Sequence, residues 1–126
     1  MFELAIEAHH FAAAHCIRGH AGRCAQLHGH NYRVVVVVAA EGLNELGMVV
    51  DFAELKAICN RAVDPLDHTV LNELAAFKDA NPTAEELARH IHRVVGEQLR
   101  SATGARVSLE RVTVYESETS YASYRE

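Results

Sequence analysis

A run of seven consecutive apolar residues at positions 34–40 follows directly on a His-Gly-His-Asn-Tyr-Arg segment that begins at His28. A short run this rich in valine predicts a β-strand that is covered on both faces. In a strand, residues two apart point to the same side, so His28 and His30 aim their imidazoles into one space. The sequence therefore predicts a buried strand from residue 28 to about residue 41 that opens with two potential metal ligands.

The remaining patterns predict two strands on either side of two helices. Residues 2 to 15 alternate as a first strand, residues 106 to 116 form a third, and residues 121 to 125 form a short fourth. The apolar parity of the third strand switches near Glu110 and Arg111, which predicts a β-bulge there. The order strand, strand, helix, helix, strand, strand is an α+β layout in which the strand pairs are antiparallel hairpins.

Capping residues mark the ends of the two expected helices. Asp51 is a suitable N-cap for a helix that runs to about residue 62, and Thr83 with Glu86 fits a capping box at the start of the second. Gly104 is expected to end the second helix. Two helices can cover only one face of the sheet, so another copy of the chain is the simplest cover for the other face. We therefore predict a homo-oligomer.

The overall composition narrows the class of protein. With 126 residues, 49% of them hydrophobic, the chain is long enough for one domain with its own core, so we expect a single domain over residues 1–126. It has no apolar run long enough to cross a membrane and does not begin with a signal-peptide pattern, so a cytoplasmic location is expected. Three cysteines argue for free thiols, and a net charge of −5 without a basic cluster argues against nucleic acid as a partner.

His15 ends the first strand and is the natural third partner for His28 and His30. If the first two strands form a hairpin, the three imidazoles meet at its end, and three neutral imidazoles leave a fourth position open on a zinc ion. Such a site also suits iron or nickel. The alternative is that the histidines are ordinary core or surface residues, because His-Gly-His alone is a weak signal. Five further histidines are not expected to be metal ligands: His9, His10, His20, His90 and His92. Of these, His90 and His92 are expected on a partly solvated face of the second helix.

Cys24 has three interpretations on sequence grounds. It could be a fourth zinc ligand that closes a structural site. It could instead be a free thiol beside a cation and Arg23, where it is readily deprotonated and can act as a base. The third possibility is a loop cysteine without a chemical role.

Two further segments carry polar side chains suited to catalysis. Asp67 and His68 are a carboxylate next to an imidazole, a pair that can transfer protons if it reaches the site, although such pairs also cap turns. Glu116 ends the third strand and could accept hydrogen bonds from the N–H groups of a guanidine-like heterocycle, or it could be a solvated strand end.

Six motifs in this order give the chain a family resemblance. They are Phe11-Ala-Ala-Ala-His15, Cys24-Ala-Gln-Leu-His28-Gly-His30, Gly47-Met-Val-Val-Asp51-Phe52, Leu66-Asp67-His68-Thr-Val-Leu71-Asn72, Pro82-Thr83-Ala-Glu85 and Val112-Thr-Val-Tyr-Glu116. Together they resemble the 6-pyruvoyl tetrahydropterin synthase and 6-carboxytetrahydropterin synthase family, from about residue 2 to residue 124. The resemblance implies the tunnelling fold, an antiparallel four-stranded sheet with two helices on one side, assembled as trimers or as dimers of trimers.

The resemblance also implies a role for individual residues. The zinc ligands would be His15, His28 and His30. Cys24 would be the proton acceptor, and Asp67 with His68 would form a proton relay. Glu116 would anchor the pterin ring of a 7,8-dihydroneopterin triphosphate substrate and join the relay, and Thr83 is a further candidate for substrate binding.

Within that family, three features resemble the bacterial 6-carboxytetrahydropterin synthases. They are the short chain, the three residues between Cys24 and His28, and the Leu-Asp-His passage that begins at Leu66. These relatives form 6-carboxytetrahydropterin, acetaldehyde and triphosphate on the route to queuosine and other 7-deazapurines. A synthase that forms the 6-pyruvoyl product and a zinc-stabilised pterin-binding protein without this activity are the alternatives. Cys16, in place of the basic residue often seen after the first zinc histidine, leaves Arg23 as the expected triphosphate contact.

Overall fold

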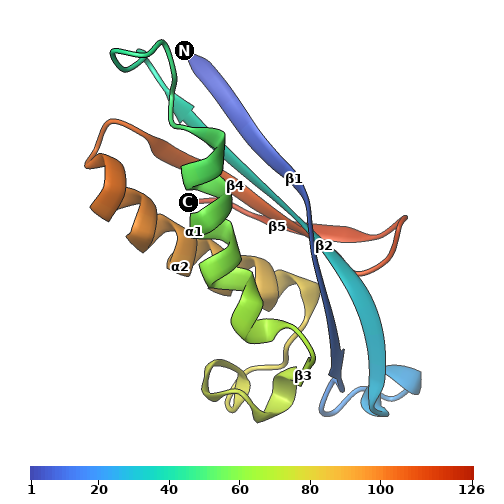
Figure 1. The fold of residues 1–126 in the computed structure, drawn as a ribbon. Helices are drawn as coiled ribbons and strands as arrows, with labels where there is room; N and C mark the ends of the chain where they lie inside the picture. The colour runs from blue at the N-terminus through green and yellow to red at the C-terminus, as the bar shows by residue number, and fades with distance from the viewer.

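The computed structural model describes the backbone of residues 1–126 and every side chain except that of Ala8. A long antiparallel hairpin of β1 (Phe2–His15) and β2 (His28–Ala40) extends through the whole molecule (Figure 1). Two helices follow, α1 (Phe52–Val63) and α2 (Ala84–Thr103), and then a second hairpin of β4 (Ser108–Tyr115) and β5 (Tyr121–Tyr124). The α+β class and the order of these six elements are confirmed.

The sheet has the order β3-β1-β2-β4-β5 and contains one strand that the sequence did not predict. The four expected strands pair antiparallel, whereas β3 (Thr69–Val70) pairs parallel with β1 through Ala13 and Ala14. A two-residue strand is too short to produce a periodic pattern, and only its contact with β1 defines it.

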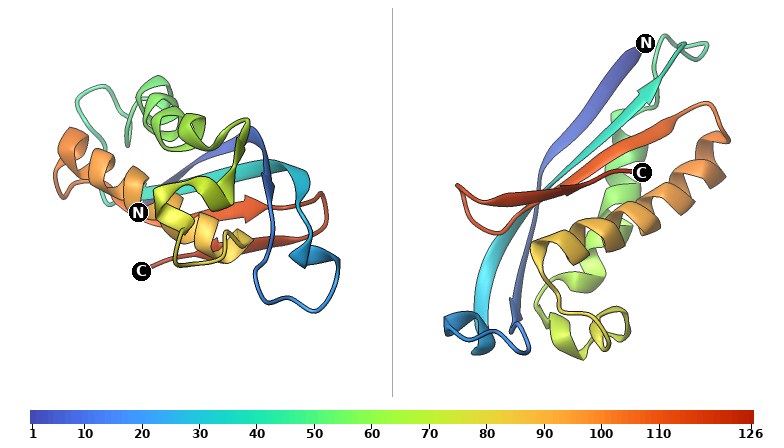
Figure 2. Two further views of the ribbon diagram at one scale, coloured as in Figure 1. Left: turned by 90° about the horizontal axis from the view of Figure 1, so that it is seen from below. Right: turned by 180° about the vertical axis from the view of Figure 1, so that it is seen from behind.

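Both helices lie on one face of the sheet, as the two views in Figure 2 show. The residues of β2 that face the helices have even numbers, and Tyr32, Val34, Val36 and Val38 are completely buried there. The facing helix side chains are also buried: Leu55, Ile58, Leu87, Ile91 and Val95. Removing each such apolar side chain from water contributes about 1.5–3 kcal/mol to stability. Cys59 belongs to this core, and burial raises the pKa of its thiol to about 12, so it stays protonated.

The opposite face of β2 is also largely buried within a single chain. Val35 is 5% exposed and Val37 is 2% exposed. Longer side chains surround Val35 in a shallow hollow of about 410 Å³, among them Glu7 of β1, Arg111 of β4 and Arg125, which follows β5. The prediction of a strand covered on both faces is therefore correct for these valines, whereas the prediction of a homo-oligomer stays a prediction.

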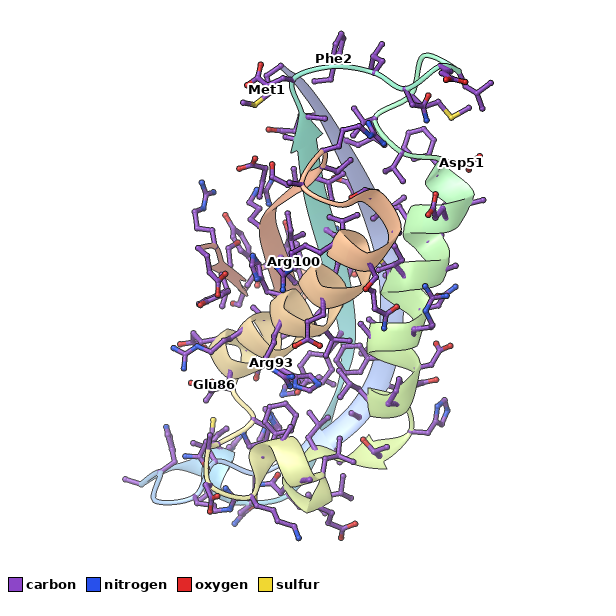
Figure 3. All side chains as sticks on the ribbon, turned by 90° about the vertical axis from the view of Figure 1, so that its left-hand side faces the viewer. Met1, Phe2, Asp51, Glu86, Arg93 and Arg100 are labelled. Carbon is purple, nitrogen blue, oxygen red and sulfur yellow. The ribbon has the colours of Figure 1, made fainter. Side chains whose placement is uncertain are left out.

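The helix ends and the bulge follow the local signals. Asp51, labelled at the start of α1 in Figure 3, accepts a hydrogen bond from the backbone N–H of Ala53. The Thr83 hydroxyl accepts from the N–H of Glu86 at 3.2 Å. Gly104 ends α2 with a φ of +64°, a conformation that favours glycine. Glu110 is the extra residue of the β4 bulge, because Arg111 and Leu109 pair with consecutive residues of β2.

His92 lies on the inner side of α2, so its expected position on a partly solvated face is wrong. It is 6% exposed, and its ring meets the Tyr124 ring edge-on at 5.0 Å. Its Nε2 atom is buried without a hydrogen-bond partner among the described residues. The polar, solvated side of the helix carries Arg93 instead, which is labelled in Figure 3. The 3.6-residue period of α2 assigns position 92 to the core, but the polar character of histidine led to the opposite prediction.

We expect the free energy of unfolding to fall as the pH is lowered below about 6.5, the usual histidine value. Burial lowers the pKa of His92 and Arg100 adds to the shift, while the Glu126 carboxylate opposes it. The unfolded chain therefore binds this proton at a higher pH than the fold does. The stabilisation is complete above the unfolded pKa and is lost as the pH falls through the folded pKa.

Urea unfolding at about pH 7.5 and about pH 5.5 tests this expectation. His92→Gln should lose less stability between the two values than the wild type, and His10→Gln, at an exposed position on β1, serves as the control. Equal losses in wild type and His92→Gln would show that His92 is not the source of the pH dependence.

Candidate metal centre

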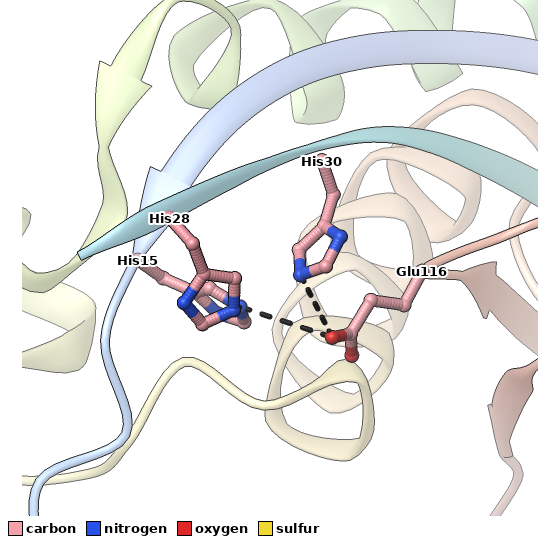
Figure 4. Close-up of side chains that lie close together, drawn as sticks. All are labelled: His15, His28, His30 and Glu116. Atoms are coloured by element: carbon pink, nitrogen blue, oxygen red, sulfur yellow. Dashed lines mark hydrogen bonds and ion pairs between the residues drawn. The ribbon is translucent and has the colours of Figure 1, made fainter. Parts of the chain in front are cut away.

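Three histidines from two strands meet at the end of the first hairpin. His15 is the last residue of β1, and its register partner on β2 is His28, while His30 pairs with Ala13. All three side chains therefore project to the same side of the hairpin, and the ring centroids of each pair lie 4.6–5.1 Å apart. Figure 4 shows the three rings turned toward one another. Hairpin pairing thus brings together the three residues that the sequence proposed as ligands.

Backbone carbonyls determine which imidazole nitrogens face the centre. His15 Nδ1 lies 2.7 Å from the Pro82 carbonyl, and His28 Nδ1 lies 2.7 Å from the Gln26 carbonyl. A carbonyl oxygen only accepts, so each Nδ1 carries the proton and each Nε2 presents a lone pair. Metal-bound histidines are held in this way by an acceptor behind the ring.

The spacing of the Nε2 atoms suits a tetrahedral metal ion. Those of His15 and His28 are 3.0 Å apart, and two lone pairs at this separation repel each other unless a cation lies between them. Nitrogen ligands about 2.0–2.1 Å from zinc in tetrahedral geometry lie about 3.3 Å apart. His30 Nε2 is buried and makes no contact with hydrogen-bond geometry among the described residues, although Glu116 Oε1 lies 2.9 Å from it, which is the arrangement expected for two atoms that share a metal ion. The donor set therefore fits zinc.

Glu116 follows β4 and reaches the same point (Figure 4). Its Oε1 lies 2.9 Å from His30 Nε2 and 3.9 Å from His15 Nε2. The four ligand atoms, three imidazole nitrogens and one carboxylate oxygen, all lie within 4.8 Å of one another. Burial lowers the pKa of His30, the carboxylate opposes this shift and the neighbouring histidines add to it, which favours a neutral, metal-binding imidazole.

Tyr32 lies beneath the histidines in the core and contacts the His15 ring, a role that the sequence analysis did not assign. It is fully buried two residues after His30 on the same face of β2, and it stacks on Phe11 at 4.7 Å. Its hydroxyl lies 3.3 Å from His15 Nδ1. Burial, with a smaller effect of Glu116, raises the pKa of Tyr32, so the hydroxyl remains protonated. The strand parity that selected His28 and His30 was the signal that could have found it.

A hollow of about 240 Å³ opens beside Glu116 at the start of α2. Its lining combines the first residues of the helix with the turn between β4 and β5: Ala84, Glu85, Glu116, Ser120, Tyr121 and Ala122. Thr83 precedes this wall, with its hydroxyl engaged as the helix cap. The carboxylate of Glu116 thus stands between the histidine cluster and a pocket with room for part of a small molecule.

Comparison with known proteins places this arrangement in a family. The family model for 6-pyruvoyl tetrahydropterin synthase matches residues 4–126. The chain belongs to this family. Members are lyase-type enzymes that act on pterins, which agrees with the resemblance found in the motifs. No helix among the described residues has the length and apolar character needed to cross a membrane.

Individual members of the tetrahydropterin synthase family are similar to the chain over most of its length. A protein of Synechocystis named 6-carboxy-5,6,7,8-tetrahydropterin synthase is 38% identical over 119 residues, covering 90% of this chain and 86% of the relative. The Bacillus subtilis protein of the same name is 36% identical over 121 residues, covering 92% and 80%. The solved structure of Caenorhabditis elegans 6-pyruvoyl tetrahydropterin synthase superposes with a TM-score of 0.83 at 26% identity, over 100% of this chain and 97% of that one. The tunnelling fold is therefore confirmed.

Cys24 lies near the end of the loop that joins β1 and β2. It is half-buried in the short 3₁₀ helix η1 (Arg23–Ala25), and its carbonyl accepts from the N–H of Ile17 at 2.6 Å. Its sulfur is not part of the four-ligand group. Arg23 is exposed and forms no ion pair with any described side chain.

Asp67 and His68 are in contact, but neither belongs to the group of four ligand atoms. Asp67 Oδ1 accepts from the N–H of Ala12 at 2.9 Å and lies 3.0 Å from His68 Nδ1. The Ala12 N–H and, after it, His68 lower the pKa of Asp67. The His68 side chain is 83% exposed, and its residue has a φ of +57°.

His68 lies beside the end of β1, where its side chain is exposed to solvent. It borders a shallow hollow of about 360 Å³ whose lining includes Ala12, Ala14, Asn31 and, from the ligand group, His30. Because side chains alternate along a strand, Ala12 and Ala14 point away from the face that carries His15. The hollow thus combines residues of both faces, and within one chain His68 is not a member of the group of four ligand atoms.

Proposed function

We propose that the chain is a zinc-dependent 6-carboxy-5,6,7,8-tetrahydropterin synthase. It would convert 7,8-dihydroneopterin triphosphate to 6-carboxytetrahydropterin, acetaldehyde and triphosphate in the cytoplasm, on the route to queuosine and other 7-deazapurines. The observation that carries the proposal is the set of three Nε2 atoms at one point, two of them oriented by carbonyls behind their rings. Relatives that are 36% and 38% identical and bear this name support the choice of product.

In this proposal His15, His28 and His30 hold Zn²⁺. Zinc bound there would act as a Lewis acid on oxygen atoms of the pterin side chain and stabilise the negative charge that develops when a proton leaves. The Nδ1 contacts with Pro82 and Gln26 keep the rings in the ligating tautomer without further rearrangement. The three-histidine set leaves one coordination position for the substrate.

Glu116 has a second task in this proposal, which is to accept hydrogen bonds from the N–H groups of the pterin ring. Its side chain is 32% exposed and lines the hollow beside the start of α2, so a ring seated there would contact the carboxylate, whose Oε1 lies 2.9 Å from His30 Nε2. A charged acceptor makes stronger hydrogen bonds than a neutral one. Thr83 borders the same wall, and the exposed guanidinium of Arg23 is available for the triphosphate.

Cys24 would take a proton from the substrate, and Asp67 with His68 would relay protons. The exposure of His68 and its absence from the group of four ligand atoms support a further step: the relay pair of one chain serves the metal centre of a neighbouring copy. This requires a homo-oligomer, a trimer or a dimer of trimers, in agreement with the prediction drawn from the apolar run of β2.

Glu116→Gln separates the two possible tasks of this residue. As a pterin anchor, it should leave zinc bound and lower kcat/KM by about 10- to 100-fold, the effect of weakening a charge-assisted hydrogen bond. The measurements are zinc content after gel filtration and steady-state kinetics. Glu118→Gln, in the exposed turn two residues later, is the control. Loss of zinc from Glu116→Gln would instead make the carboxylate a fourth ligand.

Product analysis by mass spectrometry tests the function itself. The zinc-loaded protein incubated with 7,8-dihydroneopterin triphosphate should release acetaldehyde and triphosphate and form 6-carboxytetrahydropterin. The 6-pyruvoyl product would favour the alternative suggested by the similarity to the Caenorhabditis elegans 6-pyruvoyl enzyme. Pterin binding without turnover would favour a zinc-stabilised pterin-binding protein.

A further inference from the structure

The edge of β1 that faces away from β2 forms hydrogen bonds with residues 68–70 through their main chain. The residues that follow β1 form hydrogen bonds with side chains instead. The N–H of His68 donates to the carbonyl of Ala12 at 2.6 Å, and β3 pairs with the next two residues of β1. After Val70 the segment next to β1 is no longer a strand and forms two short 3₁₀ helices, η3 (Leu71–Glu73) and η4 (Ala75–Phe77). From that point, the side-chain amides of two asparagines bind the main-chain groups of the residues that follow β1.

Asn72 binds both main-chain groups of Cys16, the residue that follows His15. The N–H of Cys16 donates to Asn72 Oδ1 at 2.9 Å, and Asn72 Nδ2 donates to the carbonyl of Cys16 at 2.9 Å. A side-chain amide that accepts from and donates to one residue takes the place of a neighbouring strand. Both hydrogen bonds are partly buried, so their loss leaves polar groups poorly solvated.

Asn81 repeats this contact two residues further along the same edge. It accepts from the N–H of Arg18 at 2.9 Å and donates to the carbonyl of Arg18 at 3.1 Å, at a more exposed position. The guanidinium of Arg18 then donates to the carbonyl of Phe77 at 2.8 Å. The segment from residue 71 to residue 82 is thus bound at two points to the chain that follows His15.

This segment ends at Pro82, whose carbonyl holds His15 Nδ1. We propose that Asn72 and Asn81, here called the asparagine clamp, are positioning residues of the metal centre. The clamp keeps the Pro82 carbonyl at hydrogen-bond distance from the His15 ring. It does so because it binds residues 16–18, which follow His15, to the 71–82 segment, which carries the carbonyl. Contacts behind a ligand of this kind change metal affinity by about 10- to 100-fold when they are lost.

The inference rests on the proposed zinc centre, and zinc affinity measured by competition with a chromogenic chelator tests it. Asn72→Ala should bind zinc about 10- to 100-fold more weakly than wild type. Asn81→Ala, which removes more exposed hydrogen bonds, should show a smaller loss. Asn72→Asp keeps the acceptor for the Cys16 N–H but places an oxygen where the donor to the Cys16 carbonyl stood, so its affinity should also fall below that of wild type.

Asn44→Ala is the matched control. Asn44 Oδ1 accepts from the N–H groups of Leu46 and Met48 at 2.9 and 3.0 Å in an exposed turn, so the variant also removes two side-chain to backbone hydrogen bonds. Its zinc affinity should equal that of wild type. Circular dichroism of the metal-free proteins shows which variants are folded, and affinities are compared among those. Asn72→Asp serves as the test variant if Asn72→Ala does not fold.

Two results would overturn the inference. One is wild-type zinc affinity in folded Asn72→Ala or Asn72→Asp, and the other is an equal loss in Asn44→Ala. A wild-type protein that binds no zinc would instead contradict the proposed function, so the two failures are distinguishable.

Discussion

Cys24→Ala is expected to keep zinc and to lose acetaldehyde release by about 10²- to 10⁴-fold, the contribution of a well-placed general base. Its sulfur lies outside the group of four ligand atoms, so the metal centre does not depend on it. The half-buried position of the residue in η1, close to the start of β2, leaves the thiol accessible to a substrate. The measurements are zinc content and the initial rate of acetaldehyde formation.

The control for Cys24→Ala is Cys16→Ala, which removes a second half-buried thiol from the same loop. Only the main chain of Cys16 takes part in the contacts described above, so this variant should keep its activity. Undiminished turnover in Cys24→Ala would remove the thiol from the mechanism. Loss of zinc would show that the sulfur is a ligand and that the site is structural.

His28→Ala is expected to abolish tight zinc binding and to lower turnover by at least about 10³-fold, because the Lewis acid supplies several kcal/mol of charge stabilisation. Its side chain is only half-buried, in contrast to that of His15, so the fold should survive the substitution. Zinc at 100 times its Kd should stabilise the wild type by about 2.7 kcal/mol and the variant by nothing. Thermal unfolding with and without zinc measures the difference.

His20→Ala is the matched control for His28→Ala. His20 is an exposed histidine in the same hairpin loop, where its Nδ1 accepts from the N–H of Gly22 at 2.8 Å. It should bind zinc as wild type does. If His28→Ala retained tight zinc binding, the centre would have to be formed by His15, His30 and Glu116 instead.

Much of the fold follows from local signals. Helix α1 begins after Asp51 and α2 after Thr83, because a side-chain oxygen there accepts a hydrogen bond from a free N–H of the first turn. Gly104 ends α2 because glycine tolerates a positive φ. The bulge at Glu110 was visible as a change of apolar parity. These features depend on residues within a few positions of one another, so sequence patterns reveal them.

The features that the sequence did not predict depend on distant partners. Strand β3 exists because two residues meet β1, which lies more than fifty positions earlier in the chain. His92 is buried because Tyr124 covers it. The asparagine clamp joins Asn72 to Cys16, and no local pattern marks such a pair. The polarity of His92 and Asn72 gave no indication that segments far away in the chain would cover the one and bind to the other.

The candidate metal centre also combines features that depend on local sequence with features that depend on distant contacts. Alternation along a strand placed His28 and His30 on one side of β2, because the side-chain period of a strand is a local property. Only the tertiary structure decided that Glu116 joins the histidines, that the Pro82 carbonyl orients the His15 ring, and that His68 lies outside the group of ligand atoms. Each of these outcomes depends on contacts between segments that are far apart in the chain, and such contacts are defined only when the sheet, the helices and the 71–82 segment have packed together.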